Sequence, residues 1–191
     1  MRAYICKAGE HAFRPSVSLN IGHKTKLKGW WVNIPEEAAY TLEGDDQKDW
    51  NKLAGLSFSI LTNHKDSAMF GWRWKPGLGM FEINAYCHVN MQVVMTETLY
   101  MAKPNKEFAC WLEMDYKRNT VRFHIWEPGH IMAPEDGHKI EYEQRFGNVP
   151  AFSREIGAWF GGNNTAPHQM ILWKDKIIYY GNNIAYHNAP S

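Results

Sequence analysis

Short runs in which apolar and polar residues alternate recur along almost the whole chain, and this period of two constrains the fold more than any other feature. The longest runs span residues 69–74, 81–89, 108–115 and 121–126. Alternate side chains of an extended strand point to opposite faces, so each run predicts a strand with one apolar and one polar face. Aromatic residues make up 14% of the chain, which favours strands that bury large cross-strand side chains.

Shorter runs of the same kind complete about a dozen predicted strands, at residues 3–6, 17–21, 30–34, 93–95, 99–101, 156–160, 170–173 and 177–180. Helix and strand do not alternate, so we expect an all-β fold, an antiparallel sandwich or barrel, rather than a doubly wound sheet. One short helix is predicted from about residue 46 to 53, capped by Asp45 or Asp46. The length fits a single domain over residues 1–191, with a C-terminal arm from about residue 182.

Charge and cysteine content argue against several classes of protein. The chain carries 21 Lys plus Arg against 20 Asp plus Glu, whereas a nucleic-acid binder needs a basic surface. The three cysteines, Cys6, Cys87 and Cys110, are widely spaced and form no CxxC, so neither a zinc site nor a disulfide framework is predicted. Cys87 and Cys110 fall in apolar strand patterns and are expected to be buried free thiols. No signal peptide or membrane span is evident, and we expect a soluble protein without a membrane partner.

Two polar loops are the best candidates for a binding site. Residues 159–168 read Trp-Phe-Gly-Gly-Asn-Asn-Thr-Ala-Pro-His, a glycine- and asparagine-rich turn that can gather polar side chains. Residues 63–67 form a second polar group before another predicted strand. The candidate ligand-binding residues are Asn63, His64, Arg73, Trp159, Asn163, Asn164 and His168. The competing interpretation is that these side chains only tie turns through backbone hydrogen bonds.

No motif predicts catalysis, a metal or a cofactor. The acidic group within residues 43–49 has the ligand chemistry for calcium, but its spacing is not that of an EF-hand, and helix capping explains it. The histidines lack the short spacings of known metal motifs. Glu141 and Glu143 would share one face of a strand, as a glycosidase pair requires, but a solvated edge strand has the same pattern. We therefore expect no catalytic residue and no resident metal or cofactor.

The tryptophans are candidates for a sugar platform or a protein interface where they are exposed. Trp72 and Trp74 alternate in phase with Phe70 and are expected in the core. Trp111 and Trp126 fall on otherwise polar strand faces and are therefore the tryptophans we expect to be exposed.

Three blocks of the sequence resemble a group of small uncharacterised β-sandwich proteins of Bacteroidota and their phages. They are DxxDWNKLxGLSF at residues 46–58, HKxSAxFGWR at 64–73 and FGGNxxAPH at 160–168. The resemblance implies a jelly-roll or concanavalin-like sandwich in a phage setting, and it supplies no catalytic residues. The shape is similar to that of sandwich-type polysaccharide lyases, whose Gln-x-His signature is absent here.

Three hypotheses follow in order of preference. The first is a non-enzymatic interaction module, a phage virion accessory protein of a capsid, tail or fibre. Its partners would be other virion proteins or copies of itself, and it would be assembled in the bacterial cytoplasm; a cytoplasmic location is the alternative. The second is a carbohydrate-binding module that recognises host polysaccharide through the seven candidate residues. The third is a polysaccharide lyase or hydrolase with His64 or His168 as the base.

Overall fold

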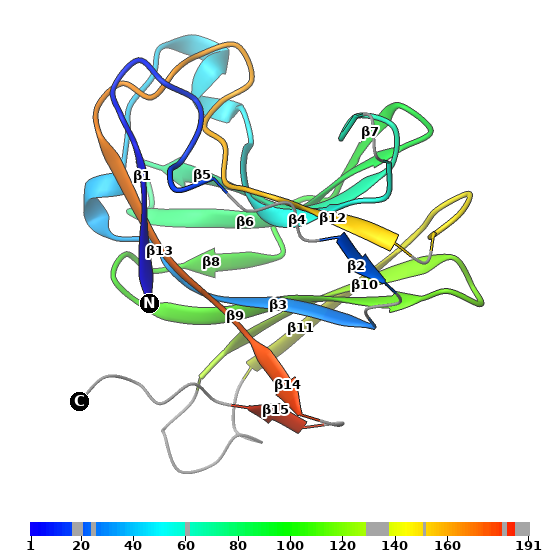
Figure 1. Cartoon of the computed structure of the whole chain (residues 1–191). Coiled ribbons are helices and arrows are strands. Elements are labelled where there is room, and N and C mark those ends of the chain that lie inside the picture. The colour runs from blue at the N-terminus through cyan, green and yellow to red at the C-terminus, as the bar shows by residue number, and fades with distance from the viewer. Residues whose placement is uncertain are drawn as a thin grey trace.

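The computed structural model describes residues 1–16, 21–23, 26–59, 62–128, 138–150, 152–180 and 183–185. These residues form two antiparallel sheets that lie face to face (Figure 1). The six strands of sheet A are, in spatial order, β1 (Arg2–Cys6), β13 (Met170–Lys176), β3 (Leu27–Asn33), β9 (Glu107–Asp115), β10 (Thr120–Glu127) and β11 (His138–Arg145). The prediction of an all-β antiparallel sandwich is confirmed.

Sheet B has seven strands. They are, in spatial order, β2 (Ile21–His23), β12 (Phe152–Ile156), β4 (Asn51–Ser57), β5 (Ser67–Lys75), β6 (Met80–Val89) and β7 (Gln92–Met95), with β8 (Tyr100–Ala102) also paired to β6. A separate hairpin of β14 (Ile178–Tyr180) and β15 (Asn183–Ala185) follows strand β13 in the chain. The rest of the predicted C-terminal arm, and residues 17–20 of a predicted strand, lie outside the described residues.

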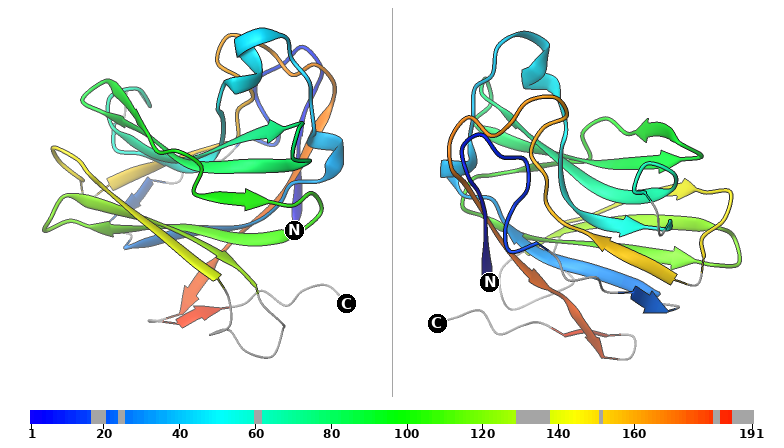
Figure 2. Two further views of the ribbon diagram at one scale, coloured as in Figure 1. Left: turned by 180° about the vertical axis from the view of Figure 1, so that it is seen from behind. Right: turned by 45° about the horizontal axis from the view of Figure 1, so that its top comes forward.

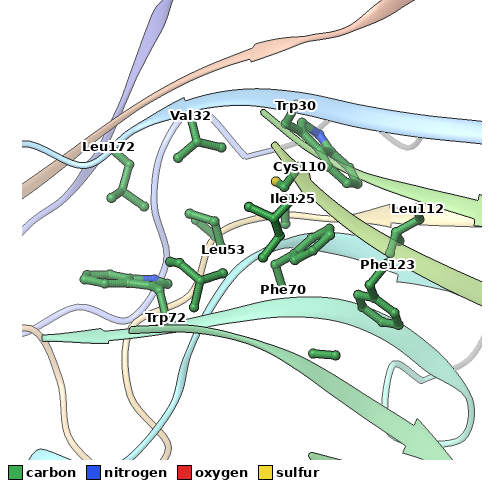
Figure 3. Packing of buried hydrophobic residues seen from close by; sticks show 14 of the residues in the cluster. Trp30, Val32, Leu53, Phe70, Trp72, Cys110, Leu112, Phe123, Ile125 and Leu172 are labelled. Atoms are coloured by element: carbon green, nitrogen blue, oxygen red, sulfur yellow. The ribbon is translucent and has the colours of Figure 1, made fainter. Parts of the chain in front are cut away.

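Apolar side chains from the inner faces of both sheets form the core. Phe70 of β5 packs edge-on against Phe123 of β10, with ring centroids 5.2 Å apart, and so joins the two sheets (Figure 3). Trp72 is completely buried beside Phe81 and Phe160. Such aromatic pairs add about 0.5–1.5 kcal/mol each to the stabilisation from burial alone. The predicted inward face of β5 is therefore confirmed.

The cysteines are part of the buried interior. Cys6, Cys87 and Cys110 are all free and all at most 1% exposed. The prediction that Cys87 and Cys110 are buried free thiols is confirmed.

The helix predicted at residues 46–53 is wrong. A short 3-10 helix, η2 (Gly44–Lys48), occupies the beginning of this segment, and β4 begins at Asn51. No side chain caps η2, and Asp45 instead pairs with Lys48. The Asn51 amide donates to the Tyr40 hydroxyl at 2.9 Å and accepts from the backbone N–H of Gly161. These contacts with distant parts of the chain, together with strand pairing on both sides of β4, override the local helical pattern. A second 3-10 helix, η1 (Glu36–Ala38), precedes η2.

The outer face of sheet B lies between raised segments at its two ends. The connection after β1, the segment containing η2 and the connection between β12 and β13 rise above the sheet at one end (Figures 1 and 2). The hairpin of β6 and β7 rises at the other end. These segments position the side chains described next.

Candidate functional site

Strand register brings an exposed tryptophan onto the outer face of sheet B. Beyond the end of β12, Trp159 forms a bridge with Lys52 of β4, and the two residues exchange both backbone N–H···O bonds, at 2.8 and 2.9 Å. Lys52 pairs in turn with Gly71, and Gly71 with Asn84. Directly opposite residues share a face, so Trp159 and Lys52 are neighbours on the side of the sheet away from the core.

The Trp159 side chain is held in place but remains accessible. Its ring stacks in parallel on that of His11, with centroids 5.1 Å apart and planes 6° from parallel. His11 is itself fixed, because its Nδ1 lies 2.8 Å from the carbonyl oxygen of Phe160. Even so, 43% of Trp159 is exposed to solvent. The indole is therefore a rigid, exposed aromatic surface.

Three polar side chains, those of Lys52, Tyr86 and Asp49, lie near one another, and the backbone pairing of Lys52 links this group to Trp159. The Lys52 ammonium lies 4.8 Å from the centre of the Tyr86 ring and donates to the backbone carbonyl of Trp50 at 3.3 Å. The carboxylate of Asp49 lies beside Gly162, where an added Cβ would come within 3.3 Å of it. Burial lowers the pKa of Lys52, and the nearby Asp49 opposes that shift. Burial also raises the pKa of Tyr86, and Asp49 raises it further. We refer to Trp159, Lys52, Tyr86 and Asp49 as the Trp159 cluster.

Arg73 lies at the same end of the face and is fully engaged in protein contacts. Its guanidinium stacks 4.2 Å from the centre of the Trp50 ring, and its Nε donates to the Glu82 carboxylate. Thr98 donates to the other oxygen of Glu82 at 2.9 Å. Burial alone would raise the pKa of Glu82, but the hydrogen bonds from Arg73 and Thr98 outweigh burial and lower it. Stacking and charge pairing within the protein therefore already occupy Arg73.

Asn63 and His64 lie toward the other end of the same face. His64 Nδ1 is 3.4 Å from His88 Nε2, and His88 Nδ1 is 3.0 Å from the buried Ser67 hydroxyl. Asn63 accepts a hydrogen bond from Arg154. Burial, and then His64 and Lys52, lower the pKa of His88. Ser67 is four residues along β5 from Gly71, a separation of about 13 Å at the usual rise of a strand.

The remaining predicted residues belong to the connection between β12 and β13. Gly161 has φ +69°, and a Cβ there would lie 2.0 Å from the backbone oxygen of Asn164, so a tight turn places Asn163 in an exposed position. His168 is exposed, and its Nε2 lies 3.0 Å from the carbonyl oxygen of Glu37. The structure thus gathers Trp159 and Arg73 at one end of the face and Asn63 and His64 at the other. His168 has a separate partner on η1.

Lys52, Tyr86 and Asp49 are missing from the sequence-based site. The alternation of β6 placed Tyr86 on the polar face, which was the available signal. Lys52 and Asp49 were assigned to the predicted helix, where neither would face Tyr86.

Among the described residues, no group of three His, Cys, Asp or Glu side chains is placed to hold a metal ion. Within the same residues, no helix is long and apolar enough to cross a membrane.

The tryptophans predicted to be exposed lie on the outer face of sheet A and are wholly or partly covered. Trp111 is 7% exposed and stacks on His124, with centroids 4.9 Å apart, so its predicted exposure is wrong. Trp126 is partly buried and packs edge-on against Trp31. The chain beyond β13 returns to this face, since the N–H of Ile177 donates to the Gly29 carbonyl. The large exposed indoles are Trp159 and Trp173, the latter 39% exposed.

Solved structures of other proteins are similar to this chain. The chain is similar to scytalido-glutamic peptidase, with a TM-score of 0.56 and 10% identity over 93% of this chain and 84% of that one. It is also similar to chicken galectin 2, with a TM-score of 0.41 and 11% identity over 85% and 98% of the two chains. Lectin II from Ulex europaeus gives a TM-score of 0.43 and 9% identity over 90% and 92%. No protein-family model and no curated protein matches the sequence. At these identities, the likeness to the peptidase shows a shared β-sandwich fold.

Proposed function

We propose that this protein binds carbohydrate through the Trp159 cluster on the outer face of sheet B. The observation that carries the proposal is the Trp159 indole, which is 43% exposed yet held by its stack on His11 and by strand register. One face of a sugar ring presents C–H groups, which pack well on an aromatic surface. A fixed aromatic ring loses little conformational entropy when a ligand binds to it.

The neighbours of Trp159 supply polar contacts for the hydroxyl groups of a sugar. Lys52 is a donor, Asp49 is an acceptor and the Tyr86 hydroxyl can act as either. A few polar groups placed around an aromatic surface give such a site its orientation and specificity. Charge pairing already occupies Arg73, so we assign Arg73 a supporting role.

A pair of tryptophan variants tests this proposal. Purified protein is screened against an array of bacterial surface polysaccharides, and the affinity of each hit is measured by calorimetry. We expect Trp159→Ala to weaken binding at least tenfold, about 1.4 kcal/mol. Trp173→Ala is the matched control, because Trp173 is 39% exposed but belongs to sheet A, and it should leave affinity unchanged. An array without hits, or equal loss in both variants, would contradict the proposal.

The virion role is a prediction from the sequence resemblance, and a surface for host polysaccharide is compatible with it. Light scattering after gel filtration, alone and with purified virion proteins, tests that role. Co-migration with a virion component is expected if the protein is assembled into a particle. A monomer that binds glycan and no virion component would refute the virion role and leave the glycan proposal intact.

A further inference from the structure

Within the part of the chain that the structure describes, the contacts of the Lys52 ammonium are with an aromatic ring and a backbone carbonyl rather than with a carboxylate. Among the described residues, no carboxylate oxygen comes within 4.0 Å of its ammonium. Its contacts there are the Trp50 carbonyl at 3.3 Å and the Tyr86 ring at 4.8 Å. By contrast, Arg73 on the same face is paired with Glu82.

The surroundings of Lys52 favour an anion over further water. Its side chain is partly buried, and that burial lowers the pKa of Lys52. An ammonium that has lost part of its hydration regains stability when a carboxylate approaches, because the attraction between charges is stronger in partly desolvated surroundings. The ring of Tyr86 supplies only part of this, since a neutral aromatic ring attracts the cation without carrying a counter-charge.

We propose that the ligand of the Trp159 cluster is an acidic glycan, in which one sugar ring stacks on Trp159 and the carboxylate of a neighbouring uronic acid unit pairs with Lys52. This inference rests on the proposed function and names its substrate class. Trp159 and Lys52 are a directly opposed, hydrogen-bonded pair, whose Cα atoms are about 5.5 Å apart in such a ladder. The Lys52 ammonium reaches past Gly71 of β5 to the Tyr86 ring of β6, whereas the Trp159 ring stacks on His11 on the other side of β4. A ring on Trp159 and a carboxylate on Lys52 therefore belong to different units of one oligosaccharide.

The charge of Asp49 should oppose the binding of an acidic sugar, whereas the charge of Lys52 should favour it. Its negative charge lies near Lys52 and Tyr86 and influences the pKa of both. A bound carboxylate would be repelled by Asp49 while being attracted by Lys52. Removing the charge of Asp49 should therefore strengthen the binding of an acidic sugar, and removing the charge of Lys52 should weaken it.

The experiment compares acidic oligosaccharides with their carboxyl-reduced forms. Oligomers of galacturonate, of glucuronate (from hyaluronan) and of alginate are titrated calorimetrically at pH 7, each beside the neutral counterpart in which the carboxyl is reduced to an alcohol. We expect at least one acidic oligomer to bind tenfold or more tightly than its neutral counterpart, with an affinity that falls as NaCl rises from 0.05 to 0.5 M.

Substitutions then assign the preference to Lys52. Lys52→Met should remove the preference for the acidic form and its salt dependence, while Lys52→Arg should retain both. Asp49→Asn should increase affinity for the acidic form. Lys48→Met is the control for net charge, because Lys48 is an exposed lysine of the adjacent η2. Thermal melts of each variant establish that the fold is intact.

The possible failures are distinguishable. If neutral glycans bind in a Trp159-dependent manner and the acidic forms bind no more tightly, the acidic-ligand inference is overturned and the proposed function stands. The same holds if Lys52→Met keeps the acidic preference. If no glycan binds at all, the proposed function fails, and the inference fails with it.

Discussion

The indole N–H of Trp30 in sheet A donates to the carboxylate of Glu155 in sheet B at 3.2 Å, across the interior of the sandwich. The other carboxylate oxygen lies 3.1 Å from the ammonium groups of both Lys28 and Lys176. Only 2% of the Glu155 side chain is exposed. One buried carboxylate therefore satisfies two lysines and an indole of the facing sheet.

Glu155→Ala should destabilise the protein by about 3–5 kcal/mol, because it leaves buried or half-buried cations without their counter-charge. Urea unfolding at pH 7 measures this loss. Glu10→Ala is the control, since Glu10 forms a solvent-exposed pair with Arg14 at 4.0 Å, and such pairs contribute at most about 1 kcal/mol. Equal effects of the two substitutions would contradict the buried role of Glu155.

The contribution of the Glu155 carboxylate to folding stability should decrease as the pH falls. Burial alone would raise the pKa of Glu155, but Lys28, Trp30 and Lys176 outweigh burial and hold it below its usual range. The folded state therefore binds a proton more weakly than the unfolded state. Glu155 stabilises the fold fully above its unfolded pKa of 4.5, and this contribution is lost as pH falls through the folded pKa. In urea melts, the difference between the native protein and Glu155→Gln should shrink over that acidic range.

The local sequence pattern was sufficient to predict the strands in which apolar and polar residues alternate regularly. Phe70, Trp72 and Trp74 of β5 were predicted to face the core, and they belong to it or pack against it, because a strand with one face on the core alternates in sequence. It was insufficient for β4. The residues that make β4 a strand include Asn51, bonded to Tyr40 and Gly161, and Lys52, bridged to Trp159. These partners are remote in sequence and leave no local signal.

The same long-range pairing explains what was missed in the candidate site. The exposed aromatic, Trp159, was recognisable beside a glycine-rich turn. Its polar neighbour Lys52 was not, because the two become adjacent only when β4 adds to the sheet. Whether His64 and His168 lie close together depends on the topology of the fold and could not be predicted from the residue types. In the structure they have separate partners, His88 for His64 and the Glu37 carbonyl for His168.

Gly161→Ala should be much more destabilising than Gly79→Ala. Both glycines have a positive φ, +69° and +62°, which costs an L-residue about 1–2 kcal/mol. At Gly161 the new Cβ would also lie 2.0 Å from the backbone oxygen of Asn164, whereas nothing lies within 4 Å at Gly79. Thermal unfolding should show a modest loss at Gly79 and at least twice that loss at Gly161. Similar losses would mean that the 161–164 turn readily rearranges.

The three thiols should be unreactive in the folded protein. Burial raises the pKa of Cys6 to about 11 and that of Cys87 to about 12, with Glu10 adding to the shift at Cys6, and burial raises the pKa of Cys110 as well. Thiolate is the reactive form, and it is scarce at pH 8 under these conditions. A colorimetric disulfide reagent at pH 8 should therefore release no chromophore from native protein and three equivalents after denaturation in urea. Rapid reaction of a native thiol would contradict the closed packing.

Lys174 should make the protein more stable as pH rises from 7 to 10. Its ammonium is buried, donates to the Leu53 carbonyl at 2.9 Å and lies 4.5 Å from the centre of the Tyr4 ring. Leu53 is the extra residue of a bulge in β4, where the ladder is locally disrupted, and Lys174 supplies a donor to its carbonyl.

The increase in stability with pH follows from the pKa of Lys174, which burial lowers from 10.5 to about 8 although Glu155 opposes the shift. Between these two values the unfolded chain holds a proton that the folded chain has released, so unfolding takes up a proton and higher pH opposes it. Neutral Lys174 still donates to Leu53. The stability of the native protein relative to Lys174→Met should therefore grow by about 2 kcal/mol between pH 7 and pH 10 in urea melts. A difference that stays constant or shrinks would show that the folded protein keeps Lys174 charged throughout this range.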